Sequence, residues 1–260
     1  MTFCLGIKVT EGLIALADTQ IVKGSERLSK AKLSLATYRD WPLCVMTSGL
    51  RSVRDKTVIY LEEQLSMVDA EFNRVYQVAN AFGAQLRRVY EEDSAALARS
   101  SLHFNLHAII GGQLSADPEP ALFYIYPEGN WVEATADAPY FIIGRTAYGK
   151  PILDLLLGGD TQLRRALGLA YLAFDATRTS VTDVDFPLDI MVFSVDTGQF
   201  RQQRCTAAML ADTTDWWQQQ LKSALDGLPL SWADSLLIKT LKKSPDCQIA
   251  RLKDVPDESH

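Results

Sequence analysis

The chain has 260 residues, of which 47% are hydrophobic and 22% are charged, and its formal net charge is −6. These values are typical of a globular protein with one substantial core. The negative charge argues against nucleic acid or an anionic membrane as the main partner, and no apolar run reaches the length of a membrane span.

The first fifty residues alternate short apolar runs with polar turns, a pattern that is typical of β-hairpins. Within the first pair of runs, Glu11 and Gly12 supply a turn. This turn folds the second strand back along the first, so we expect Asp18 to lie beside Thr2. Four strands are predicted in this part of the chain, over residues 2–9, 13–19, 33–37 and 42–48.

At Leu50 the apolar period changes to that of a helix. One amphipathic helix is expected from there to about residue 66, and a second is expected to end at about residue 98. The apolar stripe of the second helix contains Gly83. A glycine in such a stripe indicates that another element packs closely against the helix at that point.

The second half of the chain repeats the order of strands followed by helices. Its apolar runs are continuous rather than alternating, which indicates strands that are buried on both faces. We expect four strands over residues 102–112, 121–126, 131–134 and 140–143, two helices over 146–157 and 161–177, and a last hairpin over 188–195 and 199–206.

Residues 208–260 differ from the rest because large aromatic side chains stand among polar neighbours. Trp216 and Trp232 lie in helix-like stretches that Pro229 interrupts. Such a segment is either a helical pair packed on the domain or an arm that contacts another subunit, since aromatic anchors are enriched at interfaces. The sequence therefore predicts a domain over residues 2–207 and a helical extension over residues 208–260.

Four widely spaced cysteines lie in apolar, strand-like surroundings and form no CxxC pair. Buried free thiols in a reducing cytoplasm are the simplest interpretation. The start of the chain also lacks the basic and apolar regions of a secretory signal. The cysteines are Cys4, which is also an alternative nucleophile, and Cys44, Cys205 and Cys247.

The sequence contains no motif that predicts a cofactor. His103 and His107 are four residues apart, but they fall on an expected strand and no cluster of carboxylates completes a metal site. No phosphate-binding loop, dinucleotide fingerprint or GxSxG motif is present. We therefore expect no metal and no cofactor, and any unfolding of substrates with ATP requires a separate protein.

Thr2 follows the initiator methionine directly. A small second residue favours removal of Met1, which leaves a hydroxyl and a free α-amine on one residue. The pKa of an α-amine is about 7.7–8.0, so much of it is neutral near physiological pH and can act as a base towards its own hydroxyl. Because many chains begin with Met-Thr, this interpretation depends on the residues around Thr2.

Three features accompany Thr2: Asp18, a lysine at position 30 or 32, and Gly49 at a strand-to-helix junction. A lysine and an aspartate on apolar strands need each other, because burying either alone is costly. The order of Thr2, ALADT at 15–19 and AKL at 31–33 resembles the catalytic front half of proteasome β-type subunits, which are N-terminal nucleophile hydrolases. MTFCLG at the start and GKPIL at 149–153 resemble the bacterial ancestral β-subunit (Anbu) group.

This resemblance covers residues 2 to about 206 and implies an α+β fold, the four-layer αββα sandwich. It implies that Thr2 is the nucleophile, that Lys32 lowers the pKa of the amine and stabilises the developing alkoxide, and that Asp18 holds Lys32. Lys32, which precedes an apolar residue, fits the family pattern, although Lys30 is an alternative. The N–H of Gly49 is expected to face the oxyanion, unless that glycine serves only a tight turn.

The second half departs from the family pattern at two places. Proteasome β subunits have a serine just after the glycine that precedes the third helix, where this chain has Arg145 followed by Thr146. They also have an Asp…Ser pair near the end of the fourth helix, where this chain has Asp175 but Arg178, with Ser180 nearby. The resemblance implies supporting roles for these residues, and the arginines are expected to depress the pKa of the amine further.

The resulting hypothesis is a cytoplasmic threonine peptidase that cleaves peptide or protein substrates through an acyl-enzyme on Thr2. By resemblance it assembles into a ring or open ring of identical subunits. Thr47, Lys30 and Arg51 are expected to line the specificity pocket, and three polar side chains predict no sharp preference. Two alternatives are a hydrolase of a small amide and a weakly active or inactive scaffold subunit, which the missing serines favour.

Overall fold

The computed structural model describes residues 2–23, 26–67 and 71–240. Cys247 lies outside these residues. Met1, the residue whose removal is predicted, also lies outside them. The chain divides into two compact units, Met1–Ala211 and Asp212–His260, whereas the sequence predicted a boundary between residues 207 and 208. None of the helices in the described ranges is both long and apolar enough to cross a membrane.

The first unit contains two five-stranded antiparallel sheets. The first sheet has the strand order β10 (Tyr140–Gly144), β1 (Phe3–Val9), β2 (Gly12–Asp18), β11 (Leu188–Ser194) and β12 (Gln199–Cys205). The second sheet has the order β5 (Leu33–Tyr38), β6 (Trp41–Gly49), β7 (Leu106–Gly112), β8 (Ala121–Ile125) and β9 (Trp131–Glu133).

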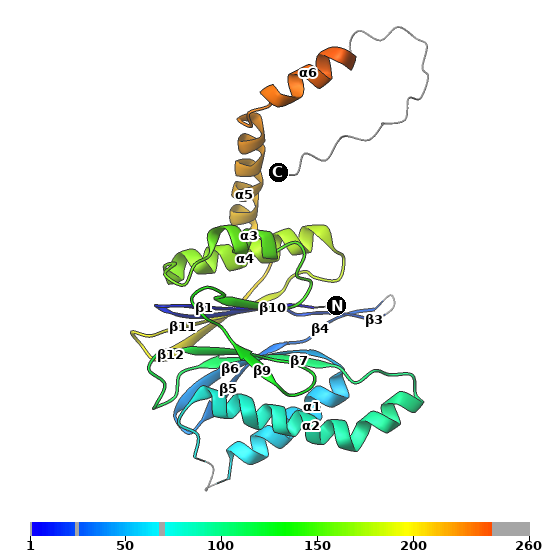
Figure 1. Ribbon diagram of the computed structural model, residues 1–260, viewed down its shortest axis with the longest axis vertical. Helices are drawn as coiled ribbons and strands as arrows, with labels where there is room; N and C mark the ends of the chain where they lie inside the picture. The colour runs from blue at the N-terminus through cyan, green and yellow to red at the C-terminus, as the bar shows by residue number, and fades with distance from the viewer. Residues whose placement is uncertain (1, 24–25, 68–70, 241–260) are drawn as a thin grey trace, which may run out of the picture. The chain divides into compact units, whose positions relative to one another are not determined.

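Two helix pairs cover the outer faces of the sheets. Figure 1 shows the layers of the first unit in order: α3 and α4, the first sheet, the second sheet, and then α1 and α2. This arrangement confirms the predicted αββα sandwich. The helices of this unit are α1 (Arg51–Leu65), α2 (Val75–Arg99), α3 (Lys150–Leu156) and α4 (Leu163–Ser180), with a short 3-10 helix, η1 (Ala208–Leu210).

Three apolar clusters fill the spaces between the four layers. One lies between α1, α2 and the second sheet and includes Phe82, and another lies between α3, α4 and the first sheet and includes Phe174. The third lies between the two sheets and includes Met46 and Ile109. Strands β1 and β2 contribute to two of these clusters, which explains why their apolar runs are continuous.

Gly83 occupies the close approach that the sequence predicted. A Cβ at Gly83 would collide with the carbonyl oxygen of Gly129, in the turn between β8 and β9. The same carbonyl accepts a hydrogen bond of 2.8 Å from Arg87, one turn further along α2. The missing side chain therefore lets α2 lie directly against this hairpin.

Some boundaries differ from the predicted ones. The strand predicted from residue 102 begins at Leu106, since α2 continues to Arg99 and Ser101 then takes a positive φ of 56°. The helix predicted from residue 146 begins at Lys150, next to a proline in its first turn, where proline is favoured. A hairpin of β3 (Gln20–Lys23) and β4 (Glu26–Ser29) was not predicted, because strands of four residues leave little periodic signal.

The second unit, over its described residues, consists of two helices, of which α5 (Ala211–Asp226) begins at the boundary and α6 (Ser231–Thr240) follows the interruption at Pro229. Both helices expose large apolar side chains, which are Trp216, Leu221, Leu225, Trp232 and Leu236. The free energy of exposing so much apolar surface is unfavourable, so these helices are suited to contact another surface.

Candidate active site

Thr2 immediately precedes β1 and is nearly buried, with 9% of its surface exposed. The β1–β2 hairpin pairs Cys4 with Ala17, so the end of β2 returns to the beginning of β1, as predicted. As a result the N–H of Phe3 donates a hydrogen bond of 2.8 Å to Oδ1 of Asp18. The peptide group that follows Thr2 is thus held directly by the predicted carboxylate.

Lys32 completes the contact with Asp18. Its Nζ lies 2.8 Å from each oxygen of the carboxylate, which is fully buried, and the Lys32 side chain is only 7% exposed. The N–H of Gln20 donates a further hydrogen bond of 3.1 Å to Oδ2. Burial raises the pKa of Asp18, and the charge and hydrogen bonds of Lys32 oppose that shift.

The structure distinguishes between the two candidate lysines. Lys32 precedes the edge strand β5, and its carbonyl accepts a hydrogen bond of 3.1 Å from the N–H of Thr47 on β6. The backbone N–H of Lys30 bonds the carbonyl of Thr19 at 2.8 Å, and the charge of Lys30 acts on Asp55. Nζ of Lys32 is the group that binds Asp18. The ammonium group that reaches Asp18 therefore belongs to Lys32, the lysine that fits the family pattern.

Gly49 ends β6 at the junction with α1, as predicted. Its φ is +148°, and a Cβ at this position would collide with the carbonyl oxygen of Asn105. That same oxygen accepts a hydrogen bond of 2.7 Å from the N–H of Leu50. The backbone geometry alone therefore requires a glycine here, and the role of its N–H towards an oxyanion stays a prediction.

Arg145 reaches Thr2 through its backbone rather than its side chain. Its N–H donates a hydrogen bond of 3.0 Å to the carbonyl of Thr2, while its guanidinium group lies 3.4 Å from Asp183. Burial raises the pKa of Asp183, but hydrogen bonds and nearby positive charges lower it overall. Arg145 contributes both a hydrogen bond and a charge to this lowering. The sequence analysis missed Asp183, whose position in a loop before β11 carries no motif.

Asp175 is almost fully buried in α4, but its partner is local. Oδ1 of Asp175 accepts a hydrogen bond of 2.8 Å from Nε of Arg178, one helical turn further on, and forms an ion pair with Nη2 of the same residue at 2.7 Å. The guanidinium group of Arg178 also lies over the ring of Phe186, 5.1 Å from its centroid. Arg178 thus occupies the position where the resemblance expects a serine, and it neutralises the carboxylate.

The two remaining supporting residues have other surroundings. Ser180 is exposed, and its hydroxyl donates to the carbonyl of Ala176 in its own helix at 2.8 Å. Thr146 is exposed in the loop before α3 and lines a separate cavity with Tyr140 and Lys150. The structure therefore gives neither hydroxyl a contact that supports the predicted role.

No protein-family model matches the chain, and no curated protein matches it. Solved structures do match. Anbu from Yersinia bercovieri is 30% identical, with a TM-score of 0.79 over 87% of this chain and 97% of that chain. The chain belongs to the Anbu family.

Other solved Anbu structures agree with this assignment. The helical assembly of the Anbu complex from Pseudomonas aeruginosa is 30% identical, with a TM-score of 0.80 over 87% of this chain and 97% of that chain. Anbu from Hyphomicrobium sp. strain MC1 is 29% identical, with a TM-score of 0.77 over 87% of this chain and 98% of that chain. The predicted family, the ancestral β-subunits, is therefore confirmed.

In this Anbu chain a cavity of about 310 Å³ begins at Lys32 and extends along the first turns of α1. Thr47 lines it, whereas Lys30 and Arg51, which were also expected to line a specificity pocket, are not among its lining residues. Arg51 contacts Asp55, a lining residue, through a hydrogen bond of 3.3 Å from its Nε. Arg54 and Asp55, which also line the cavity, were not predicted from the sequence. They stand three and four residues after Arg51, so on a helix their side chains neighbour that of Arg51, and this spacing could have indicated them.

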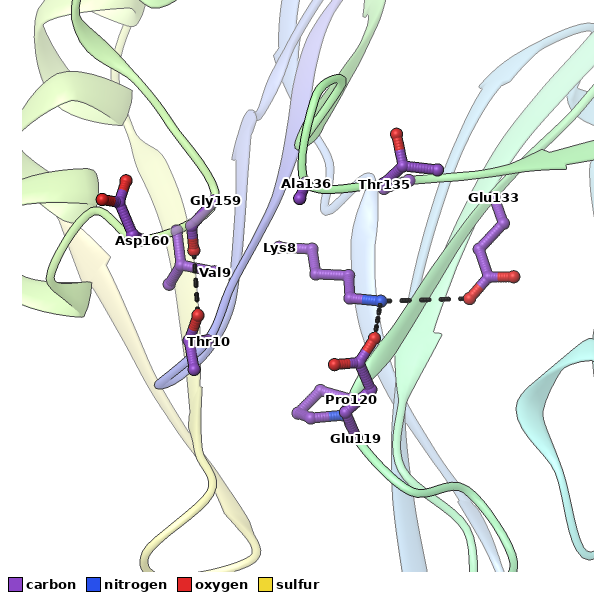
Figure 2. A pocket seen from close by; sticks show the side chains of 11 residues that line it. Lys8, Val9, Thr10, Glu119, Pro120, Glu133, Thr135, Ala136, Gly159 and Asp160 are labelled. Atoms are coloured by element: carbon purple, nitrogen blue, oxygen red, sulfur yellow. Dashed lines mark hydrogen bonds and ion pairs between the residues drawn. The ribbon is translucent and has the colours of Figure 1, made fainter.

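A larger cavity, of about 480 Å³, lies at the opposite end of β1 from Thr2. Figure 2 shows Nζ of Lys8 between two carboxylates in this cavity, 2.7 Å from Glu119 and 3.9 Å from Glu133. On its other side, the hydroxyl of Thr10 donates to the carbonyl of Gly159 at 3.1 Å. These polar groups contact one another, and the cavity is separate from the candidate active site.

Proposed function

We propose that this Anbu chain is a threonine-type peptidase whose nucleophile is Thr2, made N-terminal by removal of Met1. The observation that carries the proposal is the Asp18 carboxylate, which binds both the N–H of Phe3 and the ammonium group of Lys32. Burying an ion pair is costly in free energy and is often no better for stability than apolar packing. A buried cation fixed on the carboxylate that binds the N–H of Phe3, the residue after Thr2, is therefore better explained by its chemical use.

In the proposed reaction, Oγ of Thr2 attacks the carbonyl carbon of a peptide bond while the α-amine of Thr2 accepts the hydroxyl proton, directly or through a water. The positive charge of Lys32 lowers the pKa of that amine and stabilises the developing alkoxide. The tetrahedral intermediate then expels the leaving amine, which takes the proton, and leaves an ester on Thr2. Water hydrolyses the ester and restores the hydroxyl.

Negative charge develops on the carbonyl oxygen both when the ester on Thr2 forms and when water hydrolyses it. We assign its stabilisation to the N–H of Gly49, aided by the N-terminal end of α1, which begins two residues later. Asp18 acts on the reaction only through Lys32 and Phe3, so it is a positioning residue. Asp175, bound to Arg178, has no assigned step.

We further propose that the chain assembles into a homo-oligomer, a ring or open ring that encloses the nucleophiles. The helical assembly of the Anbu complex from Pseudomonas aeruginosa, at 30% identity, supports this proposal. The exposed apolar side chains of α5 and α6 supply a surface for such contacts. Enclosure also limits access of cytoplasmic proteins to Thr2, and the substrates are unfolded peptides or proteins.

Truncation after residue 207 tests the role of the helical extension. We expect a smaller oligomer by size-exclusion chromatography and a nearly unchanged thermal unfolding midpoint, because the three apolar clusters consist almost entirely of residues that the truncation keeps. If the truncated chain elutes as the same oligomer, the extension is not an assembly arm.

The nucleophile itself is tested by intact-mass spectrometry of the purified oligomer, before and after treatment with an electrophile selective for an N-terminal threonine. The proposal predicts loss of Met1 and one adduct, mapped to Thr2. The Thr2→Ala variant should gain no adduct, whereas Thr10→Ala, altered at an exposed threonine of the other cavity, should react like the wild type. Retained Met1 without an adduct contradicts the proposal.

A second candidate function, a scaffold subunit with little or no activity, is favoured by the guanidinium groups at both predicted serine positions. Arg178 neutralises Asp175, and Arg145 pairs with Asp183. For this candidate we expect normal assembly with an unprocessed and unreactive N-terminus. The same mass spectrum therefore decides between the two functions.

A further inference from the structure

We propose that the cavity beside Lys32 selects substrates with an acidic side chain at the residue whose carbonyl Thr2 attacks. The inference rests on the proposed function of Thr2 and concerns the substrate class of the same site. It differs from the expectation of no sharp preference, which was based on Thr47, Lys30 and Arg51 without Arg54 and Asp55.

The position of the cavity is the first support. Lys32 is one of its lining residues, and the same lysine holds its ammonium group 2.8 Å from Asp18, the carboxylate that also binds the N–H of Phe3. From Lys32 the cavity extends between α1 and strands β5 and β6. Because Lys32 belongs both to this wall and to the Asp18 cluster at residue 3, we assign the cavity to the substrate side chain next to the scissile bond.

The second support is the sign of the local charge. The chain as a whole carries a net charge of −6, yet cations outnumber carboxylates around this cavity. The charged residues that line it or act on its lining residues are the cations Lys30, Lys32, Arg51 and Arg54 and the carboxylates Asp18 and Asp55. Of these residues, Lys32, Arg54 and Asp55 line the cavity itself, so the charges of its walls have a positive excess.

The hydrogen bonds of Asp55 show that this acid does not select a basic substrate. Its Oδ1 accepts bonds from Nε and Nη2 of Arg54 at 2.8 and 2.5 Å, and its Oδ2 accepts the bond from Arg51 at 3.3 Å. Although burial raises the pKa of Asp55, the hydrogen bonds of Arg54 and Arg51 and the charges of Arg54 and Lys30 lower it overall. Asp55 is thus an ionised and already paired group.

Arg54 retains capacity to bind a substrate. A guanidinium group has five N–H donors in a fixed plane, and carboxylates match its geometry well. Two of these N–H directions point at Asp55, which leaves others for a second carboxylate. The Arg54 side chain is 18% exposed, so it is partly shielded from solvent and its charge is screened less than that of a surface arginine.

The remaining walls suit the rest of an acidic side chain. Val45, Val58 and Ile59 line the cavity and can contact the methylene groups of a glutamate. A lysine side chain would meet the same apolar walls but would be repelled by the arginines.

Binding to the Thr2→Ala oligomer tests the inference without any chemistry. Three peptides are compared by calorimetry, identical except for Glu, Gln or Lys at the position before the target bond. We expect Glu to bind about tenfold more tightly than Gln, and Lys to bind more weakly than Gln. Higher salt concentration should reduce the difference between Glu and Gln.

Variants then assign the preference to Arg54. Arg54→Gln in the Thr2→Ala oligomer should remove the difference between Glu and Gln, and Arg54→Lys, which keeps the charge, should retain most of it. Arg88→Gln is the matched control, because Arg88 is an exposed arginine on α2 that pairs with Glu92. Equal binding of Glu and Gln, absence of binding, tighter binding of Lys, or a difference that persists in Arg54→Gln overturns the inference.

Hydrolysis of the same peptides by the wild-type oligomer separates this inference from the proposed function. Hydrolysis of all three peptides without any difference in binding refutes the selectivity and supports the peptidase. Selective binding of the Glu peptide without hydrolysis supports the cavity and refutes the peptidase.

Discussion

Two buried carboxylates of this protein, Asp18 and Asp175, each bind a cation, but they do so in different ways. The partners of Asp18 come from separate segments: Lys32 before β5, and the N–H groups of Phe3 and Gln20. The partner of Asp175 is Arg178, one turn away in the same helix.

This difference has a physical meaning. A helical pair at this spacing forms whenever the helix forms, and it contributes little to specificity of the fold. The Asp18 cluster requires three segments to converge and requires that a lysine and an aspartate both leave water. An arrangement that is so costly in desolvation, placed at the residue after Thr2, supports the reaction proposed for Thr2, whereas the Asp175 pair leaves its carboxylate occupied by Arg178.

The largest expected effect concerns the Asp18 side of this comparison. Thr2→Ala should lower kcat/KM for peptide hydrolysis by about a thousandfold or more, because it removes the proposed nucleophile. Thr2→Ser keeps a hydroxyl and should retain measurable activity. If a pure Thr2→Ala oligomer still hydrolyses the peptide, Thr2 is not the nucleophile, and the contacts of Asp18 have another role.

Removing the ammonium group of Lys32 should show how strongly the stability of the protein depends on the Asp18–Lys32 ion pair. Lys32→Met leaves the Asp18 carboxylate buried without its counter-charge, so we expect the free energy of unfolding to fall by about 3–5 kcal/mol. Lys30→Met is the matched control and should change it by no more than about 0.5 kcal/mol. Denaturant titration measures both, and equal effects would contradict the assignment of Lys32.

The position of residue 2 can be disturbed from the opposite strand. Gly144 has a φ of +96°, and a Cβ there would collide with the carbonyl of Thr2. Gly144→Ala should therefore displace the nucleophile and lower kcat by about a hundredfold. Gly198→Ala is the control, since Gly198 also has a positive φ but a Cβ added to it would meet no atom within 4 Å. Equal activities of the two variants would contradict a precise requirement at Thr2.

The smallest effect is expected on the Asp175 side. Arg178→Ser restores the hydroxyl that the family resemblance expects and releases the Asp175 carboxylate. We expect hydrolysis to increase by about tenfold or less, within the range of assistance that acid–base groups supply. The wild-type and variant oligomers are compared by kcat and by thermal unfolding. A folded variant with unchanged or lower activity would show that Asp175 has no part in the reaction.

Most of the secondary structure could be predicted from the sequence because it depends on local patterns. The turn at Gly12 and the strands around it follow from neighbouring residues, and this hairpin alone is enough to bring Asp18 next to Thr2. The helical periods of α1, α2 and α4 are long enough to be recognised. The short hairpin of β3 and β4 was missed because four-residue strands are too short to show a period.

The candidate site was predicted only in part for the same reason. The sequence contained Thr2, Asp18 and two lysines, but no local pattern states which lysine reaches the carboxylate. Gly49 was singled out, whereas the carbonyl of Asn105 that excludes any side chain there comes from a distant part of the chain. Asp183, which faces Arg145, was missed because a lone aspartate in a loop carries no signal.

By itself, the sequence determined most of the elements, the hairpin that joins Asp18 to Thr2, and the resemblance to the ancestral β-subunits, since each depends on patterns of residues close together in the chain. Only the tertiary structure decided that Lys32 binds Asp18, that Arg178 occupies Asp175, and that Arg54 borders the cavity beside Lys32. These contacts depend on the angle at which strands and helices meet and on which side chains the packed layers exclude from water. Those quantities arise when separate elements pack together, not from any single stretch of sequence.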